Sequence, residues 1–209
     1  MLRSRAPRKS APLVEINLKA VLKSVVTNRN FAMLWCAYGI SALGDHLSEM
    51  AILASQNALD HNVDITPLQA RMTFVFMLPF LVFGPIAGAV ADRVPRRWIM
   101  IFADVARVGV MLTFLVLIRR CTDTFGTEWG PFLPLGMLGV FAAMFSPSRQ
   151  AMVPSLVKTE ELVYANAMIS GLGMTATMIG ALASGELAAR GLIREAFLLD
   201  ACTYALSAV

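Results

Sequence analysis

The chain contains 209 residues, of which 57% are apolar and 15% are charged, and its formal net charge is +4. Soluble domains usually hold about 45–50% apolar and about 25% charged residues, so this composition excludes an ordinary soluble domain and indicates a membrane protein. Seven of the 18 basic residues precede Asn30, whereas residues 31–209 hold 11 basic and 13 acidic residues. The basic charge therefore belongs to the start of the chain, and it does not indicate a nucleic-acid partner.

Residues 1–30 form a basic leader that we expect to lie in the cytoplasm. Within it, Leu13–Thr27 spaces apolar side chains against Glu15, Lys19 and Lys23 in a way that suits a helix lying along anionic lipid headgroups. The alternative is a partly ordered tail that only sets the topology of the spans that follow.

Six apolar stretches follow the leader, and a helix needs about 20 mainly apolar residues to cross a membrane. The predicted spans are residues 31–58, 68–91, 98–118, 131–150, 164–189 and an incomplete 196–209. Their connections are too short for a second domain, so residues 31–209 predict one all-α polytopic membrane bundle. The last stretch would cover only about 20 Å as a helix, which predicts a fragment of a longer protein.

Basic residues beside the spans predict the orientation of the bundle. If the N-terminus is cytoplasmic, twelve basic residues lie on the inner side and five on the outer side, with Arg107 inside the membrane. Because inner connections carry the excess of Lys and Arg, we expect the N-terminus inside.

Two acids lie within the first predicted span, where a charge is costly and therefore suggests function. Asp45 and Glu49 are four residues apart and share a helix face, and Asp45 lies roughly 20 Å along the helix from Asn30, near mid-membrane. Burial and mutual repulsion both favour a bound proton, so the pair is a candidate site for proton coupling or substrate contact. The alternative is a pair that faces a wet cavity and holds the helix to its neighbours. His46 has no second His or Cys at ligand spacing, which favours a hydrogen-bonded core residue over a metal ligand.

The third and fifth predicted spans also carry charges. Asp104 and Arg107 are three residues apart and can neutralise each other, which favours a structural pair that clamps the third span to the loop before it. Glu186 lies within a turn of the outer surface and Asp200 lies early in the sixth stretch. Either acid could line a transport pathway or reach to the membrane interface.

Patterns that mark enzymes are missing from the sequence. It contains no HExxH, no phosphate-binding loop with a Lys, and no Ser–Lys or Cys–His pair at workable spacing. We therefore expect no enzyme activity, no cofactor and no metal site.

The sequence GAVADRVPRR follows the second predicted span. It resembles the Gly-x-x-x-Asp-Arg-x-Gly-Arg-Arg signature of the major facilitator superfamily, which lies between the second and third helices. Pro95 stands where the signature usually has Gly, and the matching positions are Gly88, Asp92, Arg93, Arg96 and Arg97.

Other stretches resemble one branch of that superfamily, the drug and siderophore exporters related to macrolide-efflux and enterobactin-exporter proteins. They include Ser41–Asp45, Phe145–Val157 and Phe197–Val209. The resemblance implies a twelve-helix transporter of the cell (inner) membrane, of which this chain is the first six-helix half, without the end of the sixth helix and without its C-terminal partner half. It also implies that the loop acid and basic residues lock and release the cytoplasmic side, and that Asp45 binds a proton or substrate.

We therefore expect a secondary transporter that exports small amphipathic molecules by alternating access and is driven by protons, with membrane lipid around it. A lysophospholipid transporter of the same superfamily is the alternative. A membrane fragment that does not transport is a further one.

Overall fold

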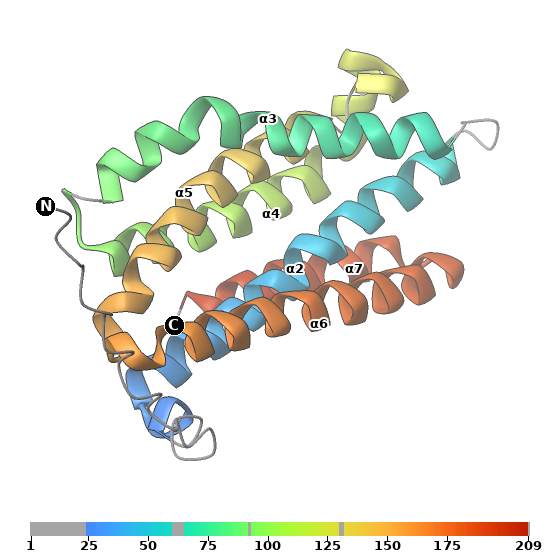
Figure 1. Cartoon of the computed structure of the whole chain (residues 1–209). Helices are drawn as coiled ribbons and strands as arrows, with labels where there is room; N and C mark the ends of the chain where they lie inside the picture. Colours follow the sequence, from blue (N-terminus) through green and yellow to red (C-terminus); the bar gives the residue numbers. More distant parts are fainter. Residues whose placement is uncertain (1–23, 60–64, 92, 130–131, 209) are drawn as a thin grey trace, which may run out of the picture.

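The computed structural model describes residues 24–59, 65–91, 93–129 and 132–208, and within these ranges the chain is helical with short turns and no strand. The helices are α2 (Arg29–Leu59), α3 (Ile65–Ala91), α4 (Arg96–Trp129), α5 (Phe132–Leu156), the 3₁₀ turn η1 (Thr159–Glu161), α6 (Leu162–Ala189) and α7 (Ile193–Ser207). The predicted all-α membrane bundle is confirmed (Figure 1). Most of the leader, including much of Leu13–Thr27, lies outside the described residues.

Three of the described helices are long and apolar enough to cross a membrane, judged by length and composition alone. They cover Thr66–Ala91, Arg96–Val116 and Thr159–Ala189. The chain is thus a multi-pass membrane protein. Large apolar side chains such as Phe74, Leu81 and Leu182 stay exposed on the outside of the bundle, as a lipid environment permits.

The helix that contains the third predicted span is longer than the span. Residues 119–129, which we expected to form a connection, continue α4 as far as Trp129. No proline occurs between Arg96 and Pro131, and a single Gly126 does not stop a helix that its neighbours can continue. Polar composition alone was therefore a poor guide to where the helix ends.

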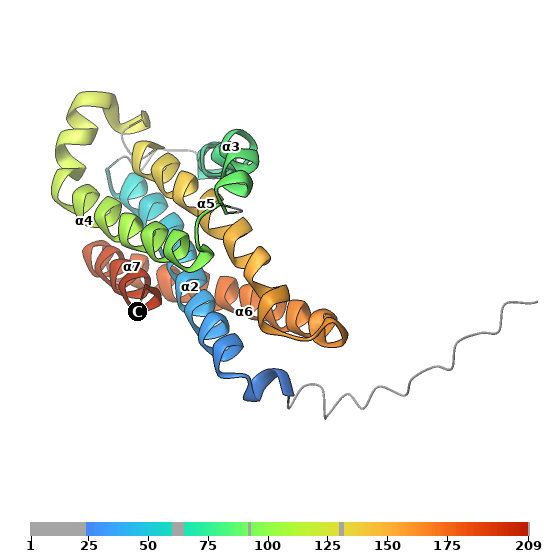
Figure 2. The same cartoon turned by 90° about the vertical axis from the view of Figure 1, so that its left-hand side faces the viewer.

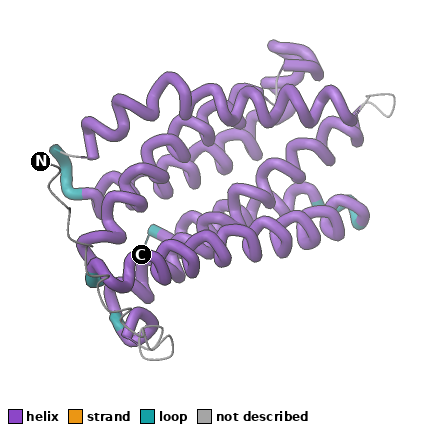
Figure 3. The backbone as a smooth tube through the Cα atoms, viewed as in Figure 1, coloured by secondary structure: helices purple, strands orange, loops and turns teal. Residues whose placement is uncertain are grey.

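Successive helices run in alternate directions, so the connections gather at the two ends of the bundle (Figures 1 and 3). The turn at 93–95 and the connection at 157–158 lie at one end, and the turn between α6 and α7 lies at the other. Gly191 occupies that last turn with φ of 71°, a conformation that side chains with a Cβ rarely adopt.

Packing between the helices follows a symmetric order. The main contacts run from α3 to α5, α4, α7, α2 and finally α6. This order is unchanged when α2, α3 and α4 are exchanged with α5, α6 and α7 and the order is read backwards. Figure 2 shows the two groups that result, with α3, α4 and α5 beside α2, α6 and α7. The order indicates that α2–α4 and α5–α7 are related three-helix repeats, and that the two spatial groups meet where α4 contacts α7.

Close helix contacts depend on glycines at two places. A Cβ on Gly139 of α5 would collide with the carbonyl oxygen of Phe76 on α3, and a Cβ on Gly180 of α6 would lie 2.9 Å from the Cβ of His46 on α2. At Gly136, one turn from Gly139, an added Cβ would instead meet the side chain of Val75 on α3 at an ordinary contact distance of 3.5 Å. Small residues therefore fix the α3–α5 and α2–α6 distances, as is common in membrane bundles.

The apolar core is divided into two clusters along the bundle axis. One contains Phe31 and Phe145 and lies toward the end that holds the 93–95 turn, and the other contains Ile52 and Phe114 and lies toward the opposite end. Between these two clusters, α2 and α4 carry the buried polar residues Ser41, Asp104 and Arg107, which belong to the site described next.

Candidate functional site

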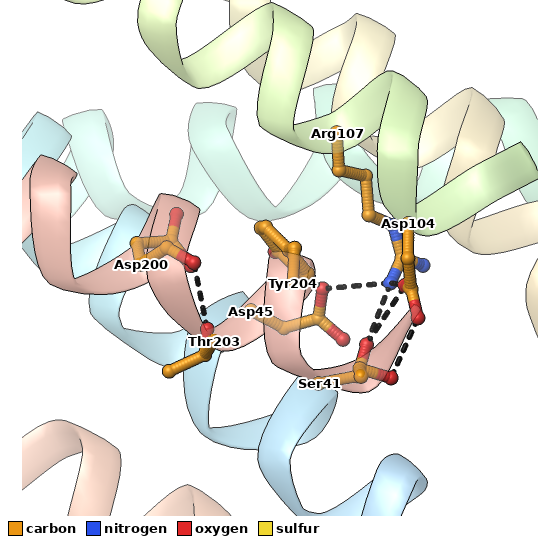
Figure 4. Close-up of polar contacts among 8 residues, drawn as sticks. Ser41, Asp45, Asp104, Arg107, Asp200, Thr203 and Tyr204 are labelled. Atoms are coloured by element: carbon orange, nitrogen blue, oxygen red, sulfur yellow. Dashed lines mark hydrogen bonds and ion pairs between the residues drawn. The ribbon is translucent and has the colours of Figure 1, made fainter. Parts of the chain in front are cut away.

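Arg107 lies at the centre of a buried polar cluster between α2, α4 and α7. Its side chain is 1% exposed, and its Nη1 donates to Asp104 Oδ1 at 3.1 Å and to Ser41 Oγ at 2.9 Å. Figure 4 shows the guanidinium reaching from α4 into the space between Asp45 and Asp104. A charge this deep in a bundle is stable only when it is paired and hydrogen-bonded, and here both conditions are met.

Asp104 joins the same three helices through its two oxygens. Ser41 Oγ of α2 donates to Oδ1 at 3.2 Å, and Ser207 Oγ of α7 donates to Oδ2 at 2.6 Å. The prediction that the Asp104–Arg107 pair clamps the third span to the loop before it is therefore wrong. The hydroxyl groups that hold the pair come from α2 and α7, because α4 packs directly on α7 and crosses α2.

Asp45 lies at the edge of the cluster and is its most accessible acid. Its Oδ1 accepts a hydrogen bond from Tyr204 Oη at 2.9 Å and lies 3.8 Å from Arg107 Nη1. Its side chain is 29% exposed, against 2% for Asp104. One carboxylate of the cluster thus fixes the cation, while the other can meet water or a ligand.

Two aromatic rings complete the surroundings of the cation. The guanidinium carbon of Arg107 lies 5.0 Å from the centre of the Phe145 ring and 5.2 Å from that of Tyr204. Both distances suit a cation–π interaction, which is strongest where water is excluded. Tyr204 therefore acts twice, with its ring on Arg107 and its hydroxyl on Asp45.

Glu49 does not join this cluster. Asp45 and Glu49 share one side of α2, but Glu49 Oε2 lies 3.9 Å from His46 Nδ1, whereas Asp45 turns toward α4 and α7. Glu186 is farther away along α6, where it is 62% exposed and pairs with Arg190 at 2.6 Å. The structure thus places the three candidate acids in three different surroundings.

The described residues of the signature Gly88–Arg97, to which the family resemblance assigns a conformational switch, lie at the end of the bundle with the 93–95 turn. Arg96 Nη1 donates to the backbone oxygen of Ala151 on α5 at 2.7 Å. Arg93 and Arg97 are exposed, and an added Cβ on Gly88 would meet open space. Asp92 lies outside the described residues. The switch residue with a defined contact is therefore Arg96, which ties α4 to α5.

A crevice of about 340 Å³ leads from this end toward the buried cluster. Arg97 and Asn30 line it together with Asp104 and Ser207. Arg97, near the start of α4, and the buried Asp104 therefore line the same crevice.

A second arginine, Arg149 of α5, was counted in the sequence only among the basic residues of the inner side. Its guanidinium carbon lies 4.2 Å from the centre of the Tyr38 ring on α2. Its Nε is buried and has no hydrogen-bond partner within the described part of the chain. Its position in the stretch Phe145–Val157, one of those that carry the family resemblance, was the available signal.

The remaining members of the cluster were also missed. Ser41, Tyr204 and Ser207 are uncharged, and such residues occur throughout apolar helices. A spacing rule could have found Ser41, which lies one helical turn before Asp45. Tyr204 and Ser207 required knowledge that α7 packs beside α2 and α4.

Comparison with known proteins is consistent with this arrangement. The sequence profile described as Major Facilitator Superfamily matches residues 20–209, which is most of the chain. The chain belongs to the major facilitator superfamily. In this superfamily each six-helix half is built from two inverted three-helix repeats, and the symmetric packing order found here has that form.

Similar proteins of this superfamily are named lysophospholipid transporter LplT. The Enterobacter sp. protein is 29% identical over 149 residues, which is 71% of this chain and 34% of the relative. The Escherichia coli protein is 30% identical over 149 residues, with the same coverage, and the Photorhabdus laumondii protein is 27% identical over 172 residues, or 82% of this chain and 39% of the relative. The chain thus spans between a third and two fifths of the length of these major facilitator proteins.

Proposed function

We propose that this chain forms part of a secondary transporter that moves small amphipathic molecules across the membrane by alternating access. The observation that carries the proposal is the Arg107 cluster, in which a fully buried cation holds a partly exposed acid, Asp45, near the middle of the bundle. Ionisable residues inside a membrane bundle usually mark a substrate or ion pathway. Asp45 is the member of the cluster that a substrate can reach.

Lysophospholipids are the substrate class with the most support, because the similar proteins carry that name. A lysophospholipid has one acyl chain and a phosphate-containing headgroup. Arg149, held on the Tyr38 ring with an unpartnered Nε, suits the phosphate. Asp45 suits a cationic headgroup amine, and the two residues present opposite charges on helices α5 and α2.

Proton coupling and export are the finer parts of the proposal. They follow from the acids of α2 and from the resemblance to exporters, and neither is part of what the relatives' names say. The drug and siderophore branch and the placement in the inner membrane with a cytoplasmic N-terminus likewise remain predictions. A membrane fragment without transport activity remains the competing hypothesis.

Alternating access would use the contact made by Arg96. Its bond to the Ala151 carbonyl closes α4 onto α5 at the 93–95 end. A guanidinium that changes partners between two states gives a bistable element of the kind that switching requires. The carboxylate of Asp92 would supply an alternative acceptor for such a guanidinium.

The test is transport by the full-length protein in proteoliposomes, with a fluorescent lysophospholipid and an amphipathic cation as the two substrates. We expect lysophospholipid movement above that of protein-free liposomes, with a loss of at least tenfold in Asp45→Asn and in Arg149→Gln. Arg190→Gln is the matched control, since Arg190 lies in an exposed pair with Glu186. Movement of neither substrate, or full activity in Asp45→Asn, would overturn the proposal. A preference for the cation would favour the drug-exporter hypothesis instead.

A further inference from the structure

A second polar cluster lies beside the Arg107 cluster, between α2 and α6, and it has no part in the site described above. It consists of His46, Glu49 and Thr177. His46 Nε2 lies 2.7 Å from Thr177 Oγ1, and His46 Nδ1 lies 3.9 Å from Glu49 Oε2. The His46 and Glu49 side chains are 31% and 28% exposed, so protons can reach them.

The hydrogen bonds of Thr177 favour one position for the proton of the neutral His46 ring. A threonine hydroxyl has one proton, and Thr177 Oγ1 lies 2.9 Å from the backbone oxygen of Gly173, which can only accept. If the hydroxyl donates to Gly173, His46 must donate from Nε2 to Thr177. The opposite assignment would leave two oxygens at 2.9 Å with no proton between them. Both contacts are satisfied only when His46 Nε2 is protonated.

This assignment directs the other ring nitrogen at an acid. In a neutral ring protonated on Nε2, the lone pair of Nδ1 faces the Glu49 carboxylate, and the two repel. One added proton, on Nδ1 or on the carboxyl group, replaces that repulsion with an attraction. The His46 ring cannot turn away easily, because Gly180 packs against its Cβ and Thr177 holds Nε2.

We propose that His46 and Glu49 together bind the single proton that drives transport. This inference rests on the proposed function, and it assigns the proton to a different place from the substrate. Asp45 already lies beside the Arg107 cation and accepts a hydrogen bond from Tyr204, and its 29% exposed side chain is left for a ligand. The His46–Glu49 pair has no such fixed cation within the described residues, and its charge changes when one proton arrives.

The charged groups on the neighbouring helices are engaged elsewhere or point into other contacts. On α4 and α7, Asp104, Arg107 and Tyr204 belong to the buried cluster. On α6, Glu186 and Arg190 pair with each other, and on α5 Arg149 lies on Tyr38. The other titratable groups of α7 are Asp200, which lies beside Gly44, and the exposed Arg194, Glu195 and Cys202. Glu49 is therefore the described acid within ion-pair distance of the His46 ring.

Proton exchange at this pair changes the charge beside the α2–α6 contact. In both states His46 Nε2 keeps its hydrogen bond to Thr177 of α6, and Glu49 lies within ion-pair distance of His46 Nδ1 on α2. When the proton is present the ring and the carboxyl group attract each other, and when it leaves the carboxylate and the ring nitrogen repel each other. Histidine is suited to such a switch, because it ordinarily changes charge between pH 5 and pH 8.

The first experiment measures proton binding without any substrate. Full-length protein labelled with ¹⁵N-histidine is examined by NMR between pH 9 and pH 5, with His46→Gln used to assign the signal. We expect Nε2 to stay protonated throughout and Nδ1 to gain a proton within this range. Glu49→Gln should change the pH at which Nδ1 gains its proton, whereas the exposed Glu195→Gln should not. A protonated Nδ1 with an unprotonated Nε2 at high pH, or equal behaviour of the two variants, would overturn the assignment.

The second experiment tests coupling in proteoliposomes. In Glu49→Gln we expect substrate exchange without a pH gradient to stay within about twofold of wild type, while acceleration by an imposed pH gradient is lost. Asp45→Asn should instead reduce both modes. If Glu49→Gln retains the full response to the gradient, or if wild type transports with no response to it, the coupling role is wrong. If wild type moves no substrate at all, the proposed function fails, and the NMR result decides the proton site alone.

Discussion

Removing Arg107 should destabilise the protein more than any other single change in the polar cluster. The substitution Arg107→Met keeps an unbranched side chain between the Phe145 and Tyr204 rings but leaves the Asp104 carboxylate buried with only Ser41 and Ser207 as donors. Breaking a buried ion pair by removing one partner costs about 3–5 kcal/mol. That range corresponds to a fall of about 10²-fold to about 4 × 10³-fold in the folding equilibrium constant.

The accessible acid should behave differently. Asp45→Asn removes a charge that is 29% exposed and 3.8 Å from the cation, while the amide oxygen can still accept from Tyr204. We expect a loss of about 1 kcal/mol or less, as for partly exposed pairs. Stability should therefore depend on Asp104 and Arg107, while transport should depend on Asp45.

Unfolding of the full-length protein by a denaturing detergent in mixed micelles, followed by tryptophan fluorescence, measures these differences. The double variant Asp104→Leu with Arg107→Met is the decisive control, since it removes both buried charges. It should recover most of the loss, because an apolar pair of similar volume needs no desolvation of ions. A loss below about 1 kcal/mol for Arg107→Met, or a double variant no more stable than the single one, would refute the assignment of a buried, mutually neutralised pair.

Three further predictions concern packing, the aromatic donor and orientation. In the same assay, Gly139→Ala should lower the free energy of unfolding by about 1–3 kcal/mol, because its Cβ collides with α3. Gly136→Ala, one turn away, should leave it unchanged or raise it by up to about 1 kcal/mol. Equal effects of the two variants would contradict the close contact. Tyr204→Phe should lose about 0.5–1.5 kcal/mol by removing the bond to Asp45 while keeping its ring, and an unchanged stability would count against that bond. Arg93→Cys in a background without other cysteines should react with an impermeant maleimide only after the cells are permeabilised, and labelling of intact cells would reverse the proposed orientation.

Much of the fold could be predicted from the sequence because its signal is local. Each apolar stretch is long enough to require a helix, and short polar connections force neighbouring helices to run in opposite directions. Pro95 and Pro131 lie in polar connections, where a proline interrupts a helix. The end of α4 at Trp129 was harder to predict, since polar residues such as Arg119 and Asp123 are compatible with a helix that extends past the apolar region.

The candidate site was predictable only in its charged members. Asp45, Asp104 and Arg107 stand out because a charge in an apolar stretch is costly. Their partners come from α2 and α7, and the distance in sequence from Asp104 to Ser207 is beyond any local rule. The shared face of Asp45 and Glu49 was predicted from their spacing. The two acids nevertheless have different partners, because Asp45 contacts Arg107 of α4 whereas Glu49 lies beside His46.

The same contacts indicate how the bundle moves. Arg107, Asp104, Ser41 and Ser207 link α2, α4 and α7 by buried bonds, and glycine contacts hold α3 to α5 and α6 to α2. Separating any of these pairs would expose a buried charge or open a close contact, and either change costs several kcal/mol, about 3–5 kcal/mol for the ion pair alone. Motion within the described helices is therefore less favourable than rotation of the whole group. Alternating access then requires groups that change partner or charge without separating these helices, and the Arg96 guanidinium and the His46–Glu49 pair are two such groups.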